Sequence, residues 1–339
     1  MQNTTDFIIV GAGISGLAFA KQINELGYSL AVFEKARGTG GRLSSKRKVY
    51  GDNLEMAFDL GCSSIAAKSS NFARQLEDWH LKGVISPWWQ DQYGTTHYVP
   101  TPRNSALTRH LSKDLDCHFS TKVTKIMRCD GIWQVFYEAS DGKIEMAKAR
   151  HIILAMPSPQ AHDLLPESSS FRKILTSSSI FPQWVMGIKV SMASEPQVGI
   201  EYPQSSIIHS ISYESTKPHR TVDPEGQVLQ IQATSNWSLN NVDEHPDDIA
   251  LQLTSELKRV INSKFVVESQ HVHRWLYSGV AESINTEASA KGYLWDGNNA
   301  LGIIGDYLTD SLYGVESAWL SASHLADLLV SSQSAGKNN

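Results

Sequence analysis

Three glycines near the N-terminus have the spacing of a phosphate-binding loop. The sequence from Gly11 to Gly16 reads GAGISG, which is a GxGxxG pattern. The first glycine of this pattern permits a tight turn, the second lets a pyrophosphate approach the backbone, and the third lets a helix and a strand pack closely. A carboxylate further along, Glu34, can accept hydrogen bonds from ribose hydroxyls. We therefore expect a dinucleotide to bind through Gly11, Ala12, Gly13, Ser15, Gly16 and Glu34.

A second pair of glycines lies among basic residues. Residues 34–42 read EKARGTGGR, so that two adjacent glycines directly precede Arg42. Adjacent glycines let the backbone turn close to a phosphate, and an arginine supplies a bidentate cation to it. A solvated basic loop would explain the charges but not the paired glycines. A nicotinamide dehydrogenase does not need this second phosphate clamp, so the segment favours FAD, held by Lys35, Arg37, Gly40, Gly41 and Arg42.

These residues require a strand, a turn and a helix around them. Residues 7–10 form a short apolar run typical of a buried parallel strand, and residues 17–26 have apolar side chains at helical spacing. A second strand is expected at residues 29–33. The same criteria predict further strands at residues 121–126, 132–137, 152–155, 228–233 and 300–304, and helices at residues 246–257 and 315–329.

Composition narrows the function classes. The chain has 339 residues, 41% of them hydrophobic, and a net charge of −5, which indicates an ordinary globular protein and gives no reason to expect a nucleic-acid partner. Cys62, Cys117 and Cys129 lack the spacing of a disulfide framework or a zinc site, so we expect reduced thiols and no metal. Neither a signal peptide nor a membrane span is recognisable, and we expect a cytoplasmic protein with a polar tail at residues 331–339.

Several stretches resemble one branch of the flavin amine oxidase superfamily, the renalases and their bacterial relatives. The GGR element at Gly40–Arg42 is that superfamily's second cofactor motif. The stretches that carry the resemblance are EKARGTGGRLSSKR (34–47), HIILAMPSPQA (151–161), QATSNWS (232–238), HRWLY (273–277), and Gly305-Asp306 followed by VESAWLS (315–321). Their order matches the family from one end of the chain to the other.

The resemblance implies an α/β fold, in which a Rossmann-type FAD-binding domain is interleaved with an α+β substrate domain built on a mixed sheet. We assign residues 1–65, 100–160 and 295–335 to the FAD-binding domain, and residues 66–99 and 161–294 to the substrate domain. The FAD is expected to be non-covalent. Further cofactor contacts are expected from Leu60, Gly61, Cys62, Ser63, Val123, Ala155, Met156, Pro157, Gly305, Asp306, Val315 and Ala318. Candidate substrate contacts are Ser64, Trp184, His209, Asn236, Trp275 and Tyr277.

The implied reaction is the oxidation of dihydronicotinamide isomers. Hydride at the 2- or 6-position of NAD(P) passes to flavin N5, and O2 then reoxidises the flavin, which gives NAD(P)+ and H2O2. No separate catalytic acid or base is assigned, because the cofactor carries the redox chemistry. The expected partners are this small-molecule substrate and O2, with no membrane and a monomer or weak dimer as the assembly.

The sequence departs from its relatives at two places. Bacterial relatives have Ala-Gln-Tyr where this chain has Cys62-Ser63-Ser64, and the segment between Asp306 and Val315 is longer here. Both changes fall where a substrate would lie. An amine oxidase or desaturase of the same fold, and a non-catalytic flavin-binding protein, are therefore the alternatives. Cys62 is interpreted as a buried structural thiol rather than a reactive one.

Overall fold

The computed structural model describes residues 4–50, 54–192, 197–220, 226–261, 264–282, 284, 289–309 and 314–336. Packing divides the chain into two units, each assembled from separate stretches. The first unit comprises Met1–Gly41, Thr108–Ile180 and Val280–Asn339, and the second comprises Arg42–Leu107 and Phe181–Gly279. Residues 42–65 and 100–107, assigned to the FAD-binding domain, thus pack in the second unit, and residues 161–180 and 280–294, assigned to the substrate domain, pack in the first. The boundaries of the two units therefore differ from those of the assigned domains.

The first unit is built on an eight-stranded sheet with the order β16-β17-β10-β1-β2-β7, to which β9 and β8 are joined through β10. The pairs β1–β10, β1–β2, β2–β7 and β10–β17 are parallel, whereas β8–β9, β9–β10 and β16–β17 are antiparallel. The strands are β1 (Thr5–Val10), β2 (Leu30–Phe33), β7 (Cys117–His118), β8 (Lys122–Cys129), β9 (Ile132–Glu138), β10 (Ile144–Leu154), β16 (Tyr293–Asp296) and β17 (Leu301–Ile304).

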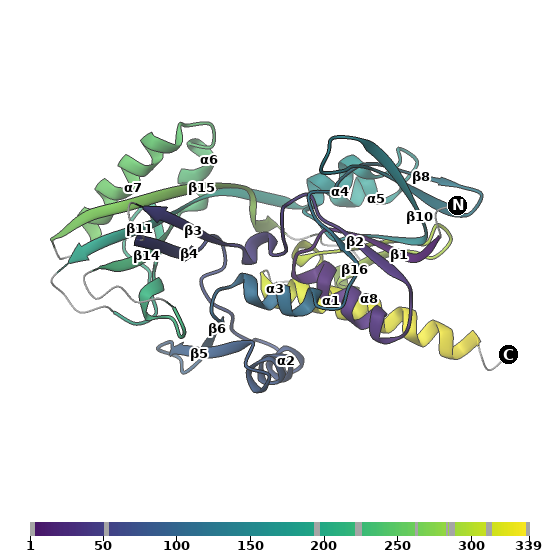
Figure 1. Ribbon diagram of the computed structural model, residues 1–339, viewed down its shortest axis with the longest axis horizontal. Coiled ribbons are helices and arrows are strands. Elements are labelled where there is room, and N and C mark those ends of the chain that lie inside the picture. Colours follow the sequence, from purple (N-terminus) through teal and green to yellow (C-terminus); the bar gives the residue numbers. More distant parts are fainter. Residues whose placement is uncertain are drawn as a thin grey trace. The chain divides into compact units, whose positions relative to one another are not determined.

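Helices cover both faces of this sheet. In Figure 1, α1 and α8 lie together on one side of the strands, and α4 and α5 lie on the other. The helices are α1 (Ile14–Glu25), α4 (Ser158–Leu164), α5 (Phe171–Leu175) and α8 (Val315–Gly336), with one 3₁₀ turn at Ser289–Lys291 and another at Asp306–Leu308. Helix α3 (Ser105–Ser112) begins in the second unit and continues into the first at Thr108. Coverage on both faces explains why β1 and β2 are apolar runs without alternation. The predicted strand, turn and helix at the N-terminus are confirmed.

The second unit contains a five-stranded sheet with the order β12-β13-β14-β11-β15. The pairings β11–β14, β12–β13 and β13–β14 are antiparallel. Two hairpins, β3–β4 and β5–β6, belong to the same unit. Its strands are β3 (Ser45–Tyr50), β4 (Leu54–Asp59), β5 (Ile85–Gln90), β6 (Thr96–Pro100), β11 (Ser179–Met192), β12 (Ile200–Glu201), β13 (Ile208–Tyr213), β14 (Gln227–Ala233) and β15 (Phe265–Glu282).

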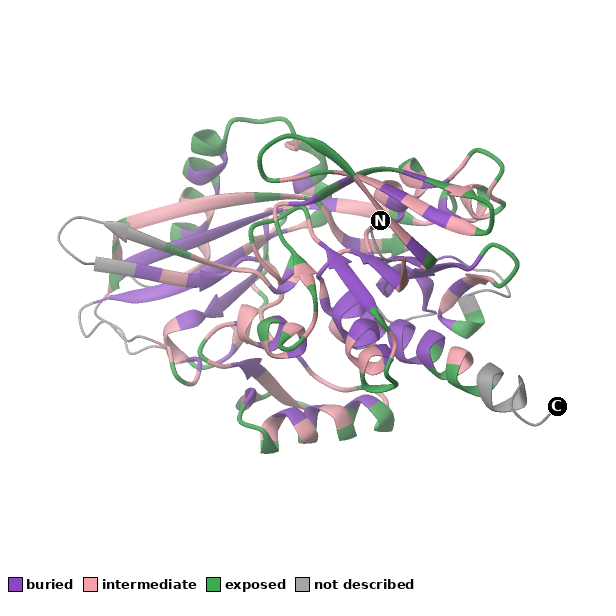
Figure 2. Ribbon diagram, turned by 45° about the vertical axis from the view of Figure 1, so that its right-hand side comes forward, coloured by how far each residue is buried: buried purple, intermediate pink, exposed green. Residues whose placement is uncertain are grey.

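The helices of the second unit are α2 (Ser70–Leu81), α6 (Ser235–Asn240) and α7 (Pro246–Val260), with 3₁₀ turns at Gly41–Leu43, where the two units join, and at Glu214–Thr216. Helix α7 packs Ile249, Leu253 and Leu257 into a core formed with the strands. Strands β1 and β2 of the first sheet and β11 and β14 of the second are largely buried, as Figure 2 shows by the purple colour of the central strands. Each unit therefore has its own apolar core.

Candidate functional site

The first glycine loop joins β1 to α1, and close backbone approaches require its glycines. A Cβ atom on Gly11, whose φ is 115°, would lie 2.3 Å from the carbonyl oxygen of Ala155. A Cβ on Gly16 would lie 2.0 Å from the carbonyl oxygen of Gly11, whereas a Cβ on Gly13 would meet no atom within 4 Å. Two glycines thus pack the loop tightly, and Gly13 leaves open space beside the N-terminus of α1, where a pyrophosphate is expected.

Glu34 follows β2 and holds the first loop in place. Its Oε2 accepts a hydrogen bond from the backbone N–H of Ala12 at 2.8 Å, and its Oε1 accepts one from Ala36 at 2.8 Å. Each carboxylate oxygen has two lone pairs, so these bonds orient the side chain and leave acceptor sites for ribose hydroxyls. The sequence predicted the second of these roles, and the structure adds the first.

The second glycine pair lies against the first loop. The N–H of Gly40 donates to the carbonyl oxygen of Ala12 at 3.1 Å. A Cβ on Gly41 would lie 3.7 Å from the Cα of Gly13. Both glycines of the pair have positive φ, 139° and 51°, which favours glycine. The two glycine-rich segments therefore form one continuous backbone surface, as a clamp on a dinucleotide requires.

A third part of the first unit joins the end of β10 to the loop after β17. The Tyr307 hydroxyl donates to the carbonyl oxygen of Met156 at 3.0 Å, which ties the corner around Pro157 to this loop. Asp306 is only 2% exposed, and its Oδ2 accepts a hydrogen bond from the N–H of Gly314, directly before α8. The segment around Met156 and Pro157 and the loop after β17, both predicted to contact the cofactor, are thus linked by the hydrogen bond of Tyr307.

Arg42 begins the second unit. Its Nη1 donates to the carbonyl oxygen of Ser278 at 2.8 Å, and its own carbonyl oxygen accepts a bond from the N–H of Cys62 at 3.0 Å. A Cβ on Gly61 would lie 2.4 Å from that same carbonyl oxygen. A guanidinium has five N–H groups, so the bond to Ser278 is compatible with the predicted phosphate contact. The backbone of Arg42 also requires the glycine at position 61.

Side chains hold the backbone at residues 59–62 in a single orientation. Four successive carbonyl oxygens accept side-chain hydrogen bonds, from Gln230 to Asp59 (2.5 Å), from Trp275 to Leu60 (2.8 Å), from Gln232 to Gly61 (2.5 Å) and from Asn104 to Cys62 (2.5 Å). Gln230 also donates to Gly61 at 3.1 Å. Breaking any of these bonds would leave a partly buried polar group without a partner, at a cost of roughly 1–3 kcal/mol. We call residues 59–62 the anchored segment.

The anchored segment begins in a buried cluster of charges. Asp59 Oδ2 lies 2.9 Å from Lys217 Nζ and 2.7 Å from Arg220 Nη2, and Glu214 also contacts the Lys217 ammonium. All four side chains are at most 5% exposed. Glu214 accepts a further bond from the backbone N–H of Asp59 at 3.1 Å. Two acids face two bases, so that each buried charge has an opposite partner.

The two acids of this cluster differ in their pKa. Burial raises the pKa of Asp59, but the nearby Lys217 and Arg220 outweigh it and hold that pKa below its usual range. For Glu214, burial is the largest influence and the pKa is raised. Asp59 is therefore the acid whose charge stabilises the folded protein at neutral pH.

The surroundings of Cys62 favour the protonated form of its thiol. Burial raises the pKa of this thiol to about 11, and the thiol donates to the carbonyl oxygen of Ser64 at 2.9 Å. Burial likewise raises the pKa of Cys117 to about 11, and all three cysteines are free. A thiol with so high a pKa is not a nucleophile at neutral pH. The interpretation of Cys62 as a structural thiol is in accord with these surroundings.

The candidate substrate residues lie in different surroundings. Trp275 donates to the anchored segment, and Tyr277 follows it, half-buried, on the same strand. Trp184 is only 3% exposed and its indole N–H donates to the carbonyl oxygen of Asn241, and its contact with a substrate stays a prediction. His209 on β13 and Asn236 on α6 are exposed, and Ser64 is half-buried.

The sequence also predicted cofactor contacts from Lys35, Arg37 and Val123. Lys35 and Arg37 are exposed after β2. Val123 is buried in β8, where the pairing with β9 shifts register between Val123 and Lys125. Their contacts with the cofactor stay predictions.

Sequence reasoning missed the side chains that hold the anchored segment. Gln230 and Gln232 were recognised only as part of an alternating strand, yet two polar residues at i and i+2 on a buried strand share one face. That pattern was the available signal. Nothing near Asn104, Glu214 or Lys217 in sequence indicates a contact with Asp59 or Cys62, because these partners are far apart along the chain.

The described residues give two findings on metals and membranes. None of their His, Cys, Asp and Glu side chains gathers in a group of three or more that could hold a metal ion. Within the same ranges, none of the helices is long and apolar enough to cross a membrane.

Comparison with protein families agrees with this geometry. Residues 9–79 match the NAD(P)-binding Rossmann-like domain, and residues 83–329 match the flavin containing amine oxidoreductases. This chain belongs to the flavin containing amine oxidoreductase family. The renalase-like branch of that family is not established by these matches.

The individual relatives found by sequence match only a short part of this chain, whereas a solved structure matches nearly all of it. FLOWERING LOCUS D of Arabidopsis thaliana is 41% identical over 73 residues, which are 20% of this chain and 9% of that protein. Lysine-specific histone demethylase 1 homolog 1 of the same plant is 34% identical over 73 residues, again 9% of its length. A crystal structure of a candidate protoporphyrinogen oxidase from Exiguobacterium sp. 255-15 covers 97% of this chain and 99% of its own, with a TM-score of 0.71 and 13% identity. That likeness shows the shared fold.

The residues present fit the flavin of this family. Gly13 faces open space at a helix N-terminus, and a second glycine pair lies against the same loop. Glu34 is oriented by two backbone bonds and keeps acceptor sites for a ribose. The cofactor of this protein is therefore FAD, bound without a covalent link.

Proposed function

We propose that this protein is a FAD-dependent oxidase that removes a hydride from a carbon next to nitrogen and delivers the electrons to O2, producing H2O2. The match of residues 83–329 to the flavin containing amine oxidoreductases carries this proposal. FAD supplies the acceptor for the hydride pair. The expected partners are small molecules only, and the expected assembly is a monomer or weak dimer.

Two substrate classes share this chemistry. In an amine, the carbon that loses hydride carries the amino group. In 2- or 6-dihydronicotinamide, it is a ring carbon beside the ring nitrogen. In both, the nitrogen lone pair forms the new C=N bond as hydride leaves. The resemblance to renalases supports the dihydronicotinamides, and the family match supports the amines.

The chain's own residues would bind and orient. The two glycine loops and Glu34 would hold the dinucleotide. The anchored segment cannot shift without breaking side-chain hydrogen bonds, so it offers a rigid wall to a reacting group. Trp275 helps to hold that segment through its hydrogen bond to the carbonyl oxygen of Leu60.

Anaerobic mixing tests the proposal. The purified holoprotein is mixed with benzylamine, spermidine, 6-dihydroNAD and ordinary NADH, and loss of flavin absorbance is followed. We expect rapid bleaching by an amine or by 6-dihydroNAD, and much slower bleaching by NADH, whose hydride is not beside the ring nitrogen. Admission of air should restore the colour and yield one H2O2 per flavin. No bleaching by any of them would contradict the proposal and favour a non-catalytic flavin-binding protein, and bleaching that air does not reverse would favour a desaturase.

A further inference from the structure

The first turn of α8 carries a buried hydroxyl that the fold leaves without a hydrogen bond. Ser317 is the third residue of this helix and is 0% exposed. Among the residues that the structure describes, its Oγ atom has no hydrogen-bond partner. Such a group is uncommon in a native protein, because it loses its bonds to water and gains none in return. This arrangement indicates that a bound group, rather than the chain itself, meets the hydroxyl.

The next turn of α8 shows where this hydroxyl lies. Ser321 is on the same face of the helix as Ser317, because residues four apart lie one above the other. Its Oγ accepts a hydrogen bond from the backbone N–H of Gly305, directly after β17, at 2.9 Å. Ser317 is one turn, about 5.4 Å, nearer to the start of the helix, and helical side chains lean in that direction. Its hydroxyl therefore lies beyond the carboxyl end of β17, at the positive end of α8.

Helices α1 and α8 begin at the same edge of the first sheet. Strands β1 and β17, which precede them, are both parallel to β10, so the two helices return along the sheet in the same direction. They lie side by side in Figure 1, and Gln22 of α1 donates to Ser323 of α8 at 3.0 Å. Each of these two residues is the ninth of its helix. The N-termini of α1 and α8 are therefore level with each other.

The order of the strands indicates which part of FAD reaches the start of α8. The parallel neighbours follow one another as β2, β1, β10 and β17. Glu34, which can bind the adenosine ribose, follows β2, and Gly13, where the pyrophosphate is expected, follows β1. In the same direction, the riboflavin half of FAD comes next, at the ends of β10 and β17. That is the position of the α8 N-terminus.

The charges at this position suit an uncharged group. Asp306 is 2% exposed and its Oδ2 accepts the N–H of Gly314, directly before α8. Glu316, in the first turn of α8, is 5% exposed. Two buried acids would repel a pyrophosphate. The riboflavin half carries no charge and offers oxygen and nitrogen acceptors to a hydroxyl.

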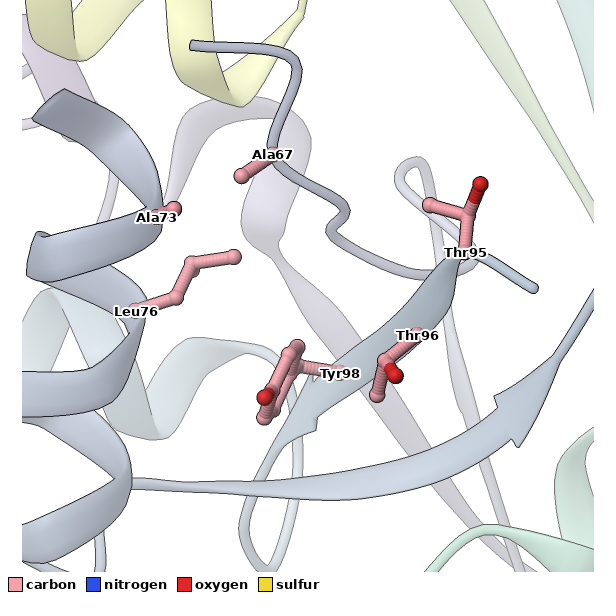
Figure 3. Close-up of a pocket in the computed structure, with 6 residues that line it drawn as sticks. All are labelled: Ala67, Ala73, Leu76, Thr95, Thr96 and Tyr98. Atoms are coloured by element: carbon pink, nitrogen blue, oxygen red, sulfur yellow. The ribbon is translucent and has the colours of Figure 1, made fainter. Parts of the chain in front are cut away.

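A small pocket of the second unit lacks a group of this kind. It has a volume of about 180 Å³ and lies between α2 and β6, lined by Leu76, Tyr98 and smaller residues, as Figure 3 shows. The Thr96 hydroxyl in its wall accepts a hydrogen bond from Gln90 at 3.1 Å. In the described part of the chain, none of the side chains that line it has a buried polar atom without a partner. A ligand there would satisfy no buried group, whereas one at the start of α8 would satisfy Ser317.

We propose that the Ser317 hydroxyl donates a hydrogen bond to the riboflavin half of FAD. The sequence predicted cofactor contacts from Val315 and Ala318 in this turn, but none from Ser317. The bond gives a partner to a group that is otherwise buried without one, so Ser317 destabilises the protein alone and stabilises its complex with FAD. This inference concerns the cofactor only and holds for either proposed substrate class.

Two ligands separate the halves of the cofactor. ADP contains the adenosine and the pyrophosphate of FAD but lacks riboflavin. The binding of FAD and of ADP to the full-length apoprotein is measured by isothermal titration calorimetry. Ser317→Ala should bind FAD about tenfold more weakly, because one hydrogen bond is lost, and should bind ADP as the wild type does. Ser317→Cys, whose thiol is a weaker donor, should lie between the two. Glu34→Gln is the control and should weaken the binding of both ligands.

Thermal unfolding of the apoprotein gives a second readout. Ser317→Ala removes the unpartnered hydroxyl, so the Tm of the apoprotein should rise by about 2 °C. Ser321→Ala is the matched control one turn along and should lower the Tm, because the N–H of Gly305 loses its partner. Equal weakening of FAD and ADP binding in Ser317→Ala, or an unchanged affinity for FAD, would overturn the proposal. So would a Tm lowered as much as in Ser321→Ala, because the hydroxyl would then bond within the fold.

Discussion

The cofactor loops of the first unit and the anchored segment of the second are rigid for different reasons. In the loops, backbone meets backbone, and glycines allow approaches that any Cβ would prevent, as at Gly11 and Gly16. In the anchored segment, side chains from distant parts of the chain bond to four carbonyls, and buried charges hold the strand that leads into it. A backbone site is sensitive to added atoms, whereas a side-chain site is sensitive to lost charge and lost hydrogen bonds.

The largest effect is expected from Asp59→Asn. It leaves Lys217 and Arg220 without their buried counter-charge, and we expect a loss of about 3–5 kcal/mol in the free energy of unfolding by urea. Asp141→Asn, in an exposed pair with Lys143, is the matched control and should leave the free energy of unfolding nearly unchanged. Equal effects of the two substitutions would mean that burial of the cluster does not matter.

Gly16→Ala should have the next largest effect. The new Cβ would meet backbone at 2.0 Å, so we expect a loss of about 3 kcal/mol together with loss of FAD. Gly13→Ala is the control, because its Cβ meets nothing within 4 Å and stability should stay nearly unchanged. FAD retained after desalting and thermal unfolding are measured in both. A Gly13 variant as unstable as the Gly16 variant would refute the packing explanation.

The two acids of the cluster should give opposite pH dependences. The lowered pKa of Asp59 means that stability present above about pH 3.8 is lost as pH falls below it. The raised pKa of Glu214 means that the folded state holds this proton longer, so stability declines as pH rises from about 4.5. Glu214→Gln should remove that decline, measured as the free energy of unfolding between pH 4.5 and 7. A decline of the same slope in the variant would show that Glu214 is not its source.

Glu34→Gln is expected to weaken FAD binding about tenfold. The amide nitrogen cannot accept the bond from Ala12 or Ala36, which loosens the loop, and the charge that suits ribose hydroxyls is lost. The dissociation constant is measured by flavin fluorescence. A variant that binds FAD as tightly as the wild type would remove Glu34 from the site.

Thiol labelling should give the smallest but cleanest contrast. At pH 8 the native protein should react with Ellman's reagent at the exposed Cys129 only, because burial raises the pKa of both Cys62 and Cys117 to about 11. In urea, three thiols should react. Rapid labelling of Cys62 in the native protein would show that the anchored segment opens.

The contrast also explains what the sequence could reveal. The loops around Gly11 and Gly40 were predictable because glycine itself is the signal, and the strands on either side are continuous apolar runs. The strand and helix predictions at residues 132–137, 246–257 and 300–304 are confirmed for the same reason, a clear period or run. Gln230, Asn104 and Lys217 gave no such signal, because their roles depend on where the fold brings Asp59 and Cys62.

Deuterium at the reacting carbon gives the most direct test of the central claim, that FAD accepts hydride from a carbon next to nitrogen. Benzylamine and its α,α-dideuterated form are mixed anaerobically with the holoprotein in a stopped-flow instrument, and flavin bleaching is recorded. The proposed chemistry predicts clearly slower bleaching with the deuterated amine, together with formation of benzaldehyde after hydrolysis of the imine. Equal bleaching rates for the two forms of benzylamine, under conditions where flavin reduction limits the observed rate, would contradict the hydride transfer. So would the absence of bleaching by both amines and dihydronicotinamides.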